Sequence, residues 1–351
     1  MRICTASLAL AAATALAFAT SSHDAGACGG FFSRRASPVP SLEVERVLLA
    51  WDRTTETEHF IRELTFQRAD QPFGFVVPTP SRPEVAKVDD PPWKALHRAF
   101  PFEGLSLSAA GAGVGSGFGA GKGRVEVLEV KRVGSFTAFT LKADDAAALK
   151  QWLDKNQFTT RPSSEAWLAH YVRLAFHFVA FRYEPAAGGD RGTVHGETVR
   201  ISFKTPAPYY PYLEPDADEK SPPLSDRVLS LWFVSQQPMT PITAVRTPAG
   251  VTWKKPWREG KTRFPVLESQ VRDAVGPKLP LPRGLPLKIP LRDPEGRPQL
   301  VVEVFEDQKT SRRGFGDVLF VPEEPMDLDE AAVERRRALL PLLDPALEPT
   351  P

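Results

Sequence analysis

The chain has 351 residues, a hydrophobic fraction of 42% and a formal net charge of +1, values that are ordinary for a globular protein. Its 44 basic residues balance 43 acidic ones, so the overall charge gives no reason to expect a nucleic-acid partner. The 35 prolines are about twice the average share and favour extended segments and turns over long helices.

The start of the chain has the layout of an export signal. Arg2 supplies a positive charge, residues 3–20 form an apolar run, and Ala25 and Ala27 are small residues in the cleavage pattern before Cys28. A membrane anchor is the alternative, but the run is rich in alanine and at the lower length limit for a spanning helix. We therefore expect cleavage after Ala27 and a periplasmic or extracellular location.

Cys28 gives this junction a second interpretation. A cysteine directly after a cleavage point can carry lipid, which would tether the protein to a membrane. The usual attachment signal has a bulky aliphatic residue where this chain has Ala25, so lipidation is the alternative to a free thiol. Because Cys4 leaves with the signal, Cys28 would be the last cysteine, which excludes an internal disulfide and a cysteine-ligated zinc site.

Strand patterns dominate the first hundred residues. Apolar or alternating runs predict strands at 44–51, 59–66 and 73–78. A short helix is expected over 92–100, with a proline in its first turn.

The glycine-rich segment 104–123 imitates a phosphate-binding loop without matching one. A P-loop would require glycine at Ser116 and a hydroxyl residue at Gly123. A dinucleotide fingerprint would require glycine at Ala120 and a helix afterwards, whereas a strand pattern follows from Val125. We therefore predict a flexible loop or linker that binds no cofactor.

The part that follows combines strands with helices. Apolar and alternating runs predict strands at 124–131, 137–142, 176–183, 198–203, 228–234 and 300–305, with a turn near Gly134. Asp144 is a suitable N-cap for one helix, Pro162 opens a second, and a third is expected near Pro265. The Pro- and Tyr-rich stretch 204–215 should be extended.

Near the C-terminus, Asp327 and Glu330 resemble a capping box for a helix that runs to Leu340. The expected fold class is α+β, mostly antiparallel β-sheet with a few short helices clustered mid-chain and one C-terminal helix. The expected organisation is a signal peptide (1–27), an N-terminal β-rich part (28–103), a glycine-rich loop or linker (104–123), an α+β part (124–321) and a C-terminal helix and tail (322–351).

Several short sequences occur in an order that resembles a known bacterial family. They are Ala27–Phe32, Glu45–Leu48, Phe73–Pro80, Val133–Phe136, Trp152–Asn156, Tyr171 with Phe178–Ala180, and Ile201–Phe203 ahead of Tyr210 and Pro211. Together they resemble the bacterial domain of unknown function 2330 family, from Cys28 to the mid-200s. The resemblance implies an exported envelope protein with no assigned activity. It also implies a second cysteine near Ser33 in many members, and its absence here leaves Cys28 without that local disulfide partner.

The most distinctive surface candidate is a run in which tryptophans alternate with cations: Trp253, Lys254, Lys255, Trp257 and Arg258. Aromatic planes beside cations could stack on sugars or bind an anionic polymer. The alternative is a strand whose tryptophans pack inside while the cations stay solvated.

Other candidate sites fail on spacing. The histidines are too scattered for a metal-ligand cluster, and the acidic stretch 216–219 lacks the glycine and glutamate of a calcium loop. Neither Ser116 nor Ser135 lies in the G-x-S-x-G pattern of many hydrolases, although a dispersed triad stays open.

We therefore expect a non-enzymatic, exported envelope protein that binds or scaffolds another envelope component, either a protein or a polysaccharide. No cofactor, metal or nucleic acid is expected, and membrane contact is expected only if Cys28 is lipidated. The alternatives are an exported hydrolase with a dispersed active site and a lipid-tethered envelope lipoprotein.

Overall fold

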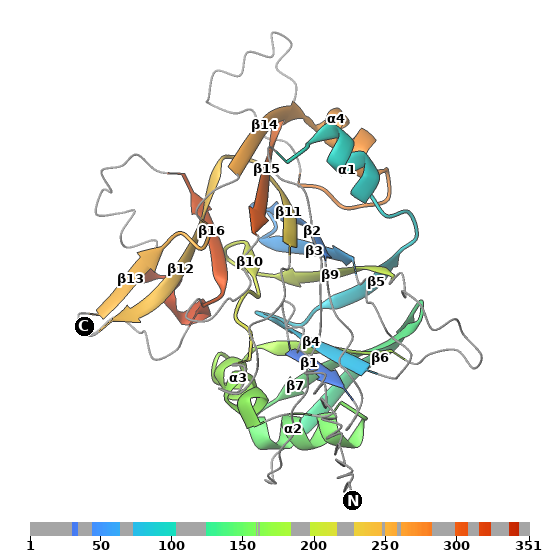
Figure 1. The fold of residues 1–351 in the computed structure, drawn as a ribbon, viewed down its shortest axis with the longest axis vertical. Helices are drawn as coiled ribbons and strands as arrows, with labels where there is room; N and C mark the ends of the chain where they lie inside the picture. The colour runs from blue at the N-terminus through green and yellow to red at the C-terminus, as the bar shows by residue number, and fades with distance from the viewer. Residues whose placement is uncertain are drawn as a thin grey trace, which may run out of the picture.

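A computed structural model gives the fold of most of the chain after residue 29 (Figure 1). It describes residues 30–33, 44–63, 73–102, 124–158, 160, 162–183, 197–215, 228–247, 250–257, 261–282, 299–307, 316–323 and 337–343. Within these ranges the protein consists of three β-sheets, four α-helices and one short 3-10 helix.

The largest sheet has seven strands in the order β14-β15-β11-β2-β3-β9-β5. In that order the strands span Lys261–Leu267, Gln299–Asp307, Val228–Ser235, Val44–Asp52, Thr57–Glu63, Thr198–Lys204 and Glu84–Val88. Every neighbouring pair is antiparallel except β11 and β2, which run parallel. Strands from the start, middle and end of the chain thus lie side by side in one sheet (Figure 1).

The second sheet has five strands in the order β1-β4-β8-β7-β6, spanning Gly30–Ser33, Phe73–Thr79, His177–Tyr183, Phe136–Ala143 and Val125–Val133. Helices α2 (Ala146–Lys155) and α3 (Pro162–Arg173) pack beside it (Figure 1), and the ring of Phe139 contacts Trp152 at 5.3 Å. The turn between β6 and β7 contains Gly134 at a φ of 57°, a conformation that favours glycine, as the sequence predicted.

The third sheet has four strands in the order β10-β16-β12-β13. These strands span Tyr209–Tyr210, Val318–Pro322, Met239–Thr247 and Gly250–Lys254. The hairpin of β12 and β13 projects from the body of the molecule, as Figure 1 shows.

The seven-stranded sheet is buried on both faces. Alternating residues of β2 divide between two cores, with Val47 and Leu49 facing the other two sheets and Leu48 and Ala50 facing the opposite way. Helices α1 (Trp93–Ala99) and α4 (Glu268–Val275) cover that second face (Figure 1). Two-sided burial explains why β11 is apolar along almost its whole length, since such a strand has no solvated face.

The predicted α+β class with mostly antiparallel sheet is confirmed, but two predicted helix starts are wrong. The N-cap of α2 is Asp145, whose carboxylate accepts from the Ala148 N–H at 2.7 Å, and not Asp144. Pro265 lies in β14, where a proline is tolerated because β14 is an edge strand, and α4 begins only after it.

The predicted C-terminal helix is not confirmed. Residues 324–336 lie outside the described ranges, and in the part described beyond them Arg337 is helical and Leu340–Leu342 form a short 3-10 helix. The glycine-rich segment 104–123 also lies outside the described residues. The strands before and after it share sheets, because β4 pairs with β8 and β3 pairs with β9.

Candidate functional site

The predicted tryptophan and lysine patch lies at the projecting β12–β13 hairpin. Trp253 and Lys254 end β13, the edge strand of the four-stranded sheet, and Lys255 follows directly. The two lysines are exposed, whereas Trp253 is half-buried and packs against the main core. Arg258 lies outside the described residues.

Trp257 belongs to the interior and is only 6% exposed. Its ring lies 5.1 Å from that of Phe305 and 6.0 Å from that of Tyr212, measured between centroids. Its Nε1 is buried and has no hydrogen-bond partner among the described residues. Trp257 therefore cannot offer a stacking face to a ligand, so Trp253 is the tryptophan that the described part of the patch can present.

The structure also contains a feature that sequence reasoning missed, a set of acidic side chains inside the protein. Five of them are at most 5% exposed: Glu45, Glu58, Glu303, Asp307 and Asp317. A buried carboxylate is costly unless hydrogen bonds or a cation replace the lost water. The partners of each one therefore show whether it serves the fold or has unused capacity for chemistry.

Asp317 lies just before β16 and accepts three hydrogen bonds. The hydroxyls of Tyr209 and Tyr171 donate to its carboxylate at 2.6 and 3.0 Å, and the Leu213 N–H donates at 2.8 Å. Burial raises the pKa of Asp317, and burial together with the Asp317 charge raises the pKa of Tyr209. This carboxylate thus joins α3, the extended tyrosine segment and the four-stranded sheet.

The other two tyrosines of the extended segment have partners of the same kind. The Tyr210 hydroxyl donates to Glu45 at 3.1 Å, and the Arg62 guanidinium lies 3.3 Å from the same carboxylate. The Tyr212 hydroxyl donates to Asp307 at 2.6 Å. Three nearby tyrosines therefore fix the segment to three buried carboxylates from different strands.

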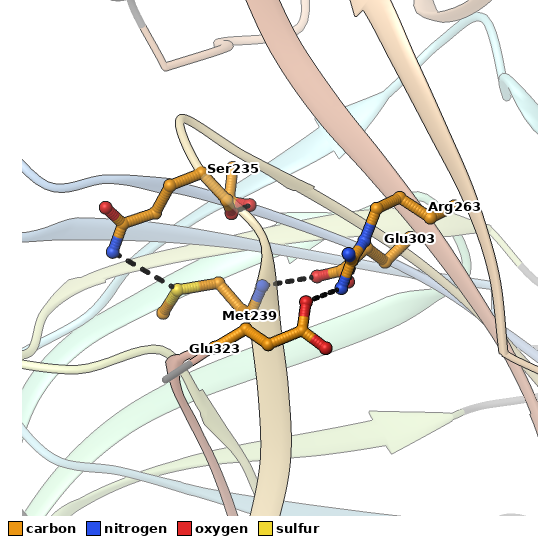
Figure 2. Close-up of polar contacts among 6 residues, drawn as sticks. Ser235, Met239, Arg263, Glu303 and Glu323 are labelled. Carbon is orange, nitrogen blue, oxygen red and sulfur yellow. Dashed lines mark hydrogen bonds and ion pairs between the residues drawn. The ribbon is translucent and has the colours of Figure 1, made fainter. Parts of the chain in front are cut away.

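Glu303 on β15 joins the seven-stranded sheet to the four-stranded sheet. It accepts from the Met239 N–H at 2.9 Å and from Nε and Nη2 of Arg263 at 3.0 and 2.9 Å. Figure 2 shows the backbone nitrogen of Met239 and the guanidinium of Arg263 both directed at Glu303, while Arg263 also pairs with the exposed Glu323. The site is saturated by its own protein partners, which identifies it as a structural junction.

Glu58 on β3 is less completely matched. The Tyr209 N–H donates to its Oε2 at 2.6 Å, but its Oε1 is buried with no hydrogen-bond partner among the described residues. Burial raises the pKa of Glu58 well above its usual value. Because this carboxyl is completely buried and one of its oxygens lacks a partner among the described residues, its ionised form is costly in the folded protein.

His59 and Ser202 resemble part of a hydrolase site. His59 Nδ1 and Ser202 Oγ lie 2.8 Å apart on adjacent strands β3 and β9. Burial and the nearby Arg200 charge lower the pKa of His59 to about 4, which keeps the imidazole neutral near pH 7. At Ser202, however, β9 is paired with both β3 and β5. The strand's amides are therefore used in the ladders and offer no oxyanion hole beside the serine.

The described residues include no group of three or more His, Cys, Asp or Glu side chains that could hold a metal ion. The acidic stretch 216–219 and Cys28 lie outside the described ranges. In the described helices, none is both long and apolar enough to cross a membrane.

Comparison with known families identifies the relationship of the chain. The family model described as "Uncharacterized protein conserved in bacteria (DUF2330)" matches residues 22–225. The chain belongs to the DUF2330 family. The resemblance predicted from the ordered sequence pieces is therefore confirmed. No curated protein and no solved structure matches the chain.

The DUF2330 match ends before β11, yet the fold continues without a break. β11 lies inside the seven-stranded sheet and pairs with β2 from the matched region and β15 from beyond it. Tyr212, within the match, likewise donates to Asp307 beyond it. The part of the chain after residue 225 thus completes the fold of this DUF2330 protein.

The tyrosine–carboxylate contacts could hardly be predicted from the sequence. The Pro- and Tyr-rich stretch marked one side of each contact, but Tyr210 and Glu45 are 165 positions apart. Nothing local to either residue indicates such a pairing.

Proposed function

We propose that this DUF2330 protein is an exported, non-enzymatic binding module of the bacterial cell envelope. The signal layout of residues 1–27 supports export, and the family relationship is compatible with a bacterial envelope role. Export places the protein among envelope polymers, so binding one of them is the simplest role for a chain of this kind.

The proposal that the protein is not an enzyme rests on the hydrogen-bond partners of its buried acids. Asp317, Glu45, Asp307 and Glu303 each accept hydrogen bonds from tyrosine hydroxyls, backbone amides or arginine of another element. A catalytic acid or base must be able to exchange a proton with a substrate within reach. These carboxylates instead accept hydrogen bonds from other elements of the fold.

The contact surface we propose is the C-terminal end of β13, at the base of the β12–β13 hairpin, with Trp253, Lys254 and Lys255. Two exposed lysines beside a half-buried indole suit an anionic polysaccharide, which can meet cations and an aromatic edge together. Lysines on an edge strand also prevent unwanted strand pairing, and a binding measurement separates the two roles.

The test is binding of the purified protein to dextran sulfate, an anionic polysaccharide probe, with neutral dextran as the reference, by biolayer interferometry. Replacing Lys254 and Lys255 by glutamate should weaken dextran sulfate binding at least about tenfold, because attractive contacts become repulsive. The matched control is the double variant Lys94→Glu and Lys278→Glu, which changes two exposed lysines elsewhere and alters the net charge equally.

An equal loss of binding in both double variants, or no binding by the wild type, would contradict a site on the hairpin.

A hydrolase screen tests the alternative function. Turnover that disappears in Ser202→Ala, with folding intact, would overturn the non-enzymatic proposal.

A further inference from the structure

A separate group of cations lies at one end of the five-stranded sheet, where β4, β7 and β8 are adjacent. His177 on β8 is paired with Lys142 on β7 and with Thr79 on β4. Residues directly opposite each other on neighbouring strands project from the same face of a sheet. Thr79, His177 and Lys142 therefore form one row across three strands, and the next strand, β6, places Glu126 opposite Lys142 without an ion pair between the two.

Arg82, three residues beyond Thr79, carries a second full positive charge at this end of the sheet. It lies just after β4, in the connection to β5, and its charge acts on His177. The connection is held in place by its neighbour Ser81, whose hydroxyl donates to the Lys204 carbonyl at 2.8 Å and accepts from the Lys204 N–H at 2.8 Å. The Arg82 side chain itself is exposed, so it can reach a ligand from solvent.

Lys142 is held in position by backbone acceptors. Its ammonium donates to the carbonyl of Ala175 and, at 3.5 Å, to that of Phe176, in the turn that follows α3. Carbonyl groups fix the ammonium without neutralising its charge. Burial lowers the pKa of Lys142, as expected for a cation that lacks a carboxylate partner.

His177 has unused hydrogen-bonding capacity. Its Nδ1 is buried and has no hydrogen-bond partner among the described residues. Burial, followed by the charges of Lys142 and Arg82, lowers its pKa to about 4. Both charges that act on His177 within the described part of the chain are thus positive.

We propose that Arg82, Lys142 and His177 form a binding site for a single oxyanion group, a phosphate, sulfate or carboxylate. Among the described residues these three side chains supply two cations and an imidazole, and Lys142 donates to backbone carbonyls instead of pairing with Glu126. A bound anion would balance this positive charge. Arg82 supplies a planar pair of donors that suits oxyanions, and Lys142 supplies a fixed point charge. The site is distinct from the β12–β13 hairpin, and its test uses a different probe.

The same arrangement gives anion binding a predictable dependence on pH. A bound anion opposes the positive charges of Lys142 and Arg82, so it raises the pKa of His177 and favours its protonation. Binding is then coupled to proton uptake, and affinity should rise as pH falls towards about 4, the pKa of His177 in the absence of the anion. Sulfate is the suitable probe because its own charge stays constant over this range.

The experiment is a sodium sulfate titration of the purified protein at constant ionic strength, followed through the His177 imidazole resonances by NMR. Sulfate should shift these resonances and raise the pKa of His177, while chloride should not. Inorganic phosphate and acetate, titrated in parallel at fixed pH, show whether the site prefers a tetrahedral anion or a carboxylate.

Arg82→Gln is the main variant, since Arg82 is exposed and the change should leave the fold intact. It should weaken sulfate binding about tenfold or more, as expected for a lost charge-assisted contact. Arg98→Gln, an exposed arginine on α1, is the matched control and should bind sulfate like the wild type.

His177→Ala should retain weak binding but lose its dependence on pH, which separates a role in binding from a role in folding. Unchanged His177 resonances in sulfate, or equal affinity in wild type and Arg82→Gln, would overturn the proposed site.

Discussion

The buried acids that join elements of the fold and the Arg82–Lys142–His177 row differ in how their charges are balanced. Buried acids such as Asp317 and Glu303 have tyrosine, backbone or arginine partners from other elements. In the row, the charges acting on His177 are both positive among the described residues. Matched charges inside a protein fix its architecture, whereas unmatched cations near its surface leave capacity for a ligand.

The substitution expected to lower the free energy of unfolding most is the removal of Asp317. Asp317→Ala removes the shared carboxylate that accepts from the Tyr209 and Tyr171 hydroxyls and from the Leu213 N–H. Each orphaned donor costs about 1–3 kcal/mol, so we expect a loss of about 5 kcal/mol in the free energy of unfolding, measured by urea denaturation. Tyr171→Phe removes one donor only and should cost about 1 kcal/mol. Equal effects of the two variants would mean that Asp317 does not act as a shared acceptor.

The next largest expected effect on the free energy of unfolding concerns the two tryptophans of the predicted patch. Trp257 is buried among aromatic rings, so Trp257→Ala should lower the unfolding free energy by about 3–5 kcal/mol. Trp253 is half-buried, and Trp253→Ala should cost about 1 kcal/mol. Thermal denaturation of both variants checks the pair, and a larger loss for Trp253 would reverse their assigned roles.

Glu58 gives the smallest and most specific test. Because burial raises its pKa in the folded state, the folded protein binds the proton more tightly than the unfolded chain. The ionised carboxyl therefore destabilises the fold increasingly as pH rises above the ordinary glutamate pKa of 4.5. Glu58→Gln cannot ionise, so it should melt at a higher temperature than the wild type at pH 7.

The advantage of Glu58→Gln should shrink as pH falls and disappear below pH 4.5, where Glu58 is protonated in the unfolded chain as well as in the folded protein. Glu56→Gln, at an exposed glutamate between β2 and β3, serves as the control for a general charge effect. A stability difference that is the same at every pH would refute the raised pKa.

Local sequence pattern predicted most of the elements but not their neighbours. The apolar run of β11 predicted a strand, and the capping residue and proline near α2 and α3 predicted two helices within a residue. The pattern did not separate the end of β14 from the start of α4 around Pro265, because edge pairing overrode a proline that usually opens helices.

The candidate sites were harder to predict because exposure depends on distant contacts. Trp253 and Trp257 are four positions apart and look equivalent in sequence, yet Trp257 packs on rings from the extended tyrosine segment and β15. Lys142 and His177 likewise come together only because β7 and β8 are paired.

By itself, the sequence determined the strand and helix types, the α+β class and the DUF2330 relationship, since these depend on local periodicity and short ordered motifs. Tertiary structure alone decided which acids are buried and matched, as in Asp307 with Tyr212, and which of the described cations lie beside a neutral group and not in an ion pair, as in Lys142 beside His177. The physical reason is that solvation and charge balance depend on neighbours in space, and here those neighbours lie far apart in the chain.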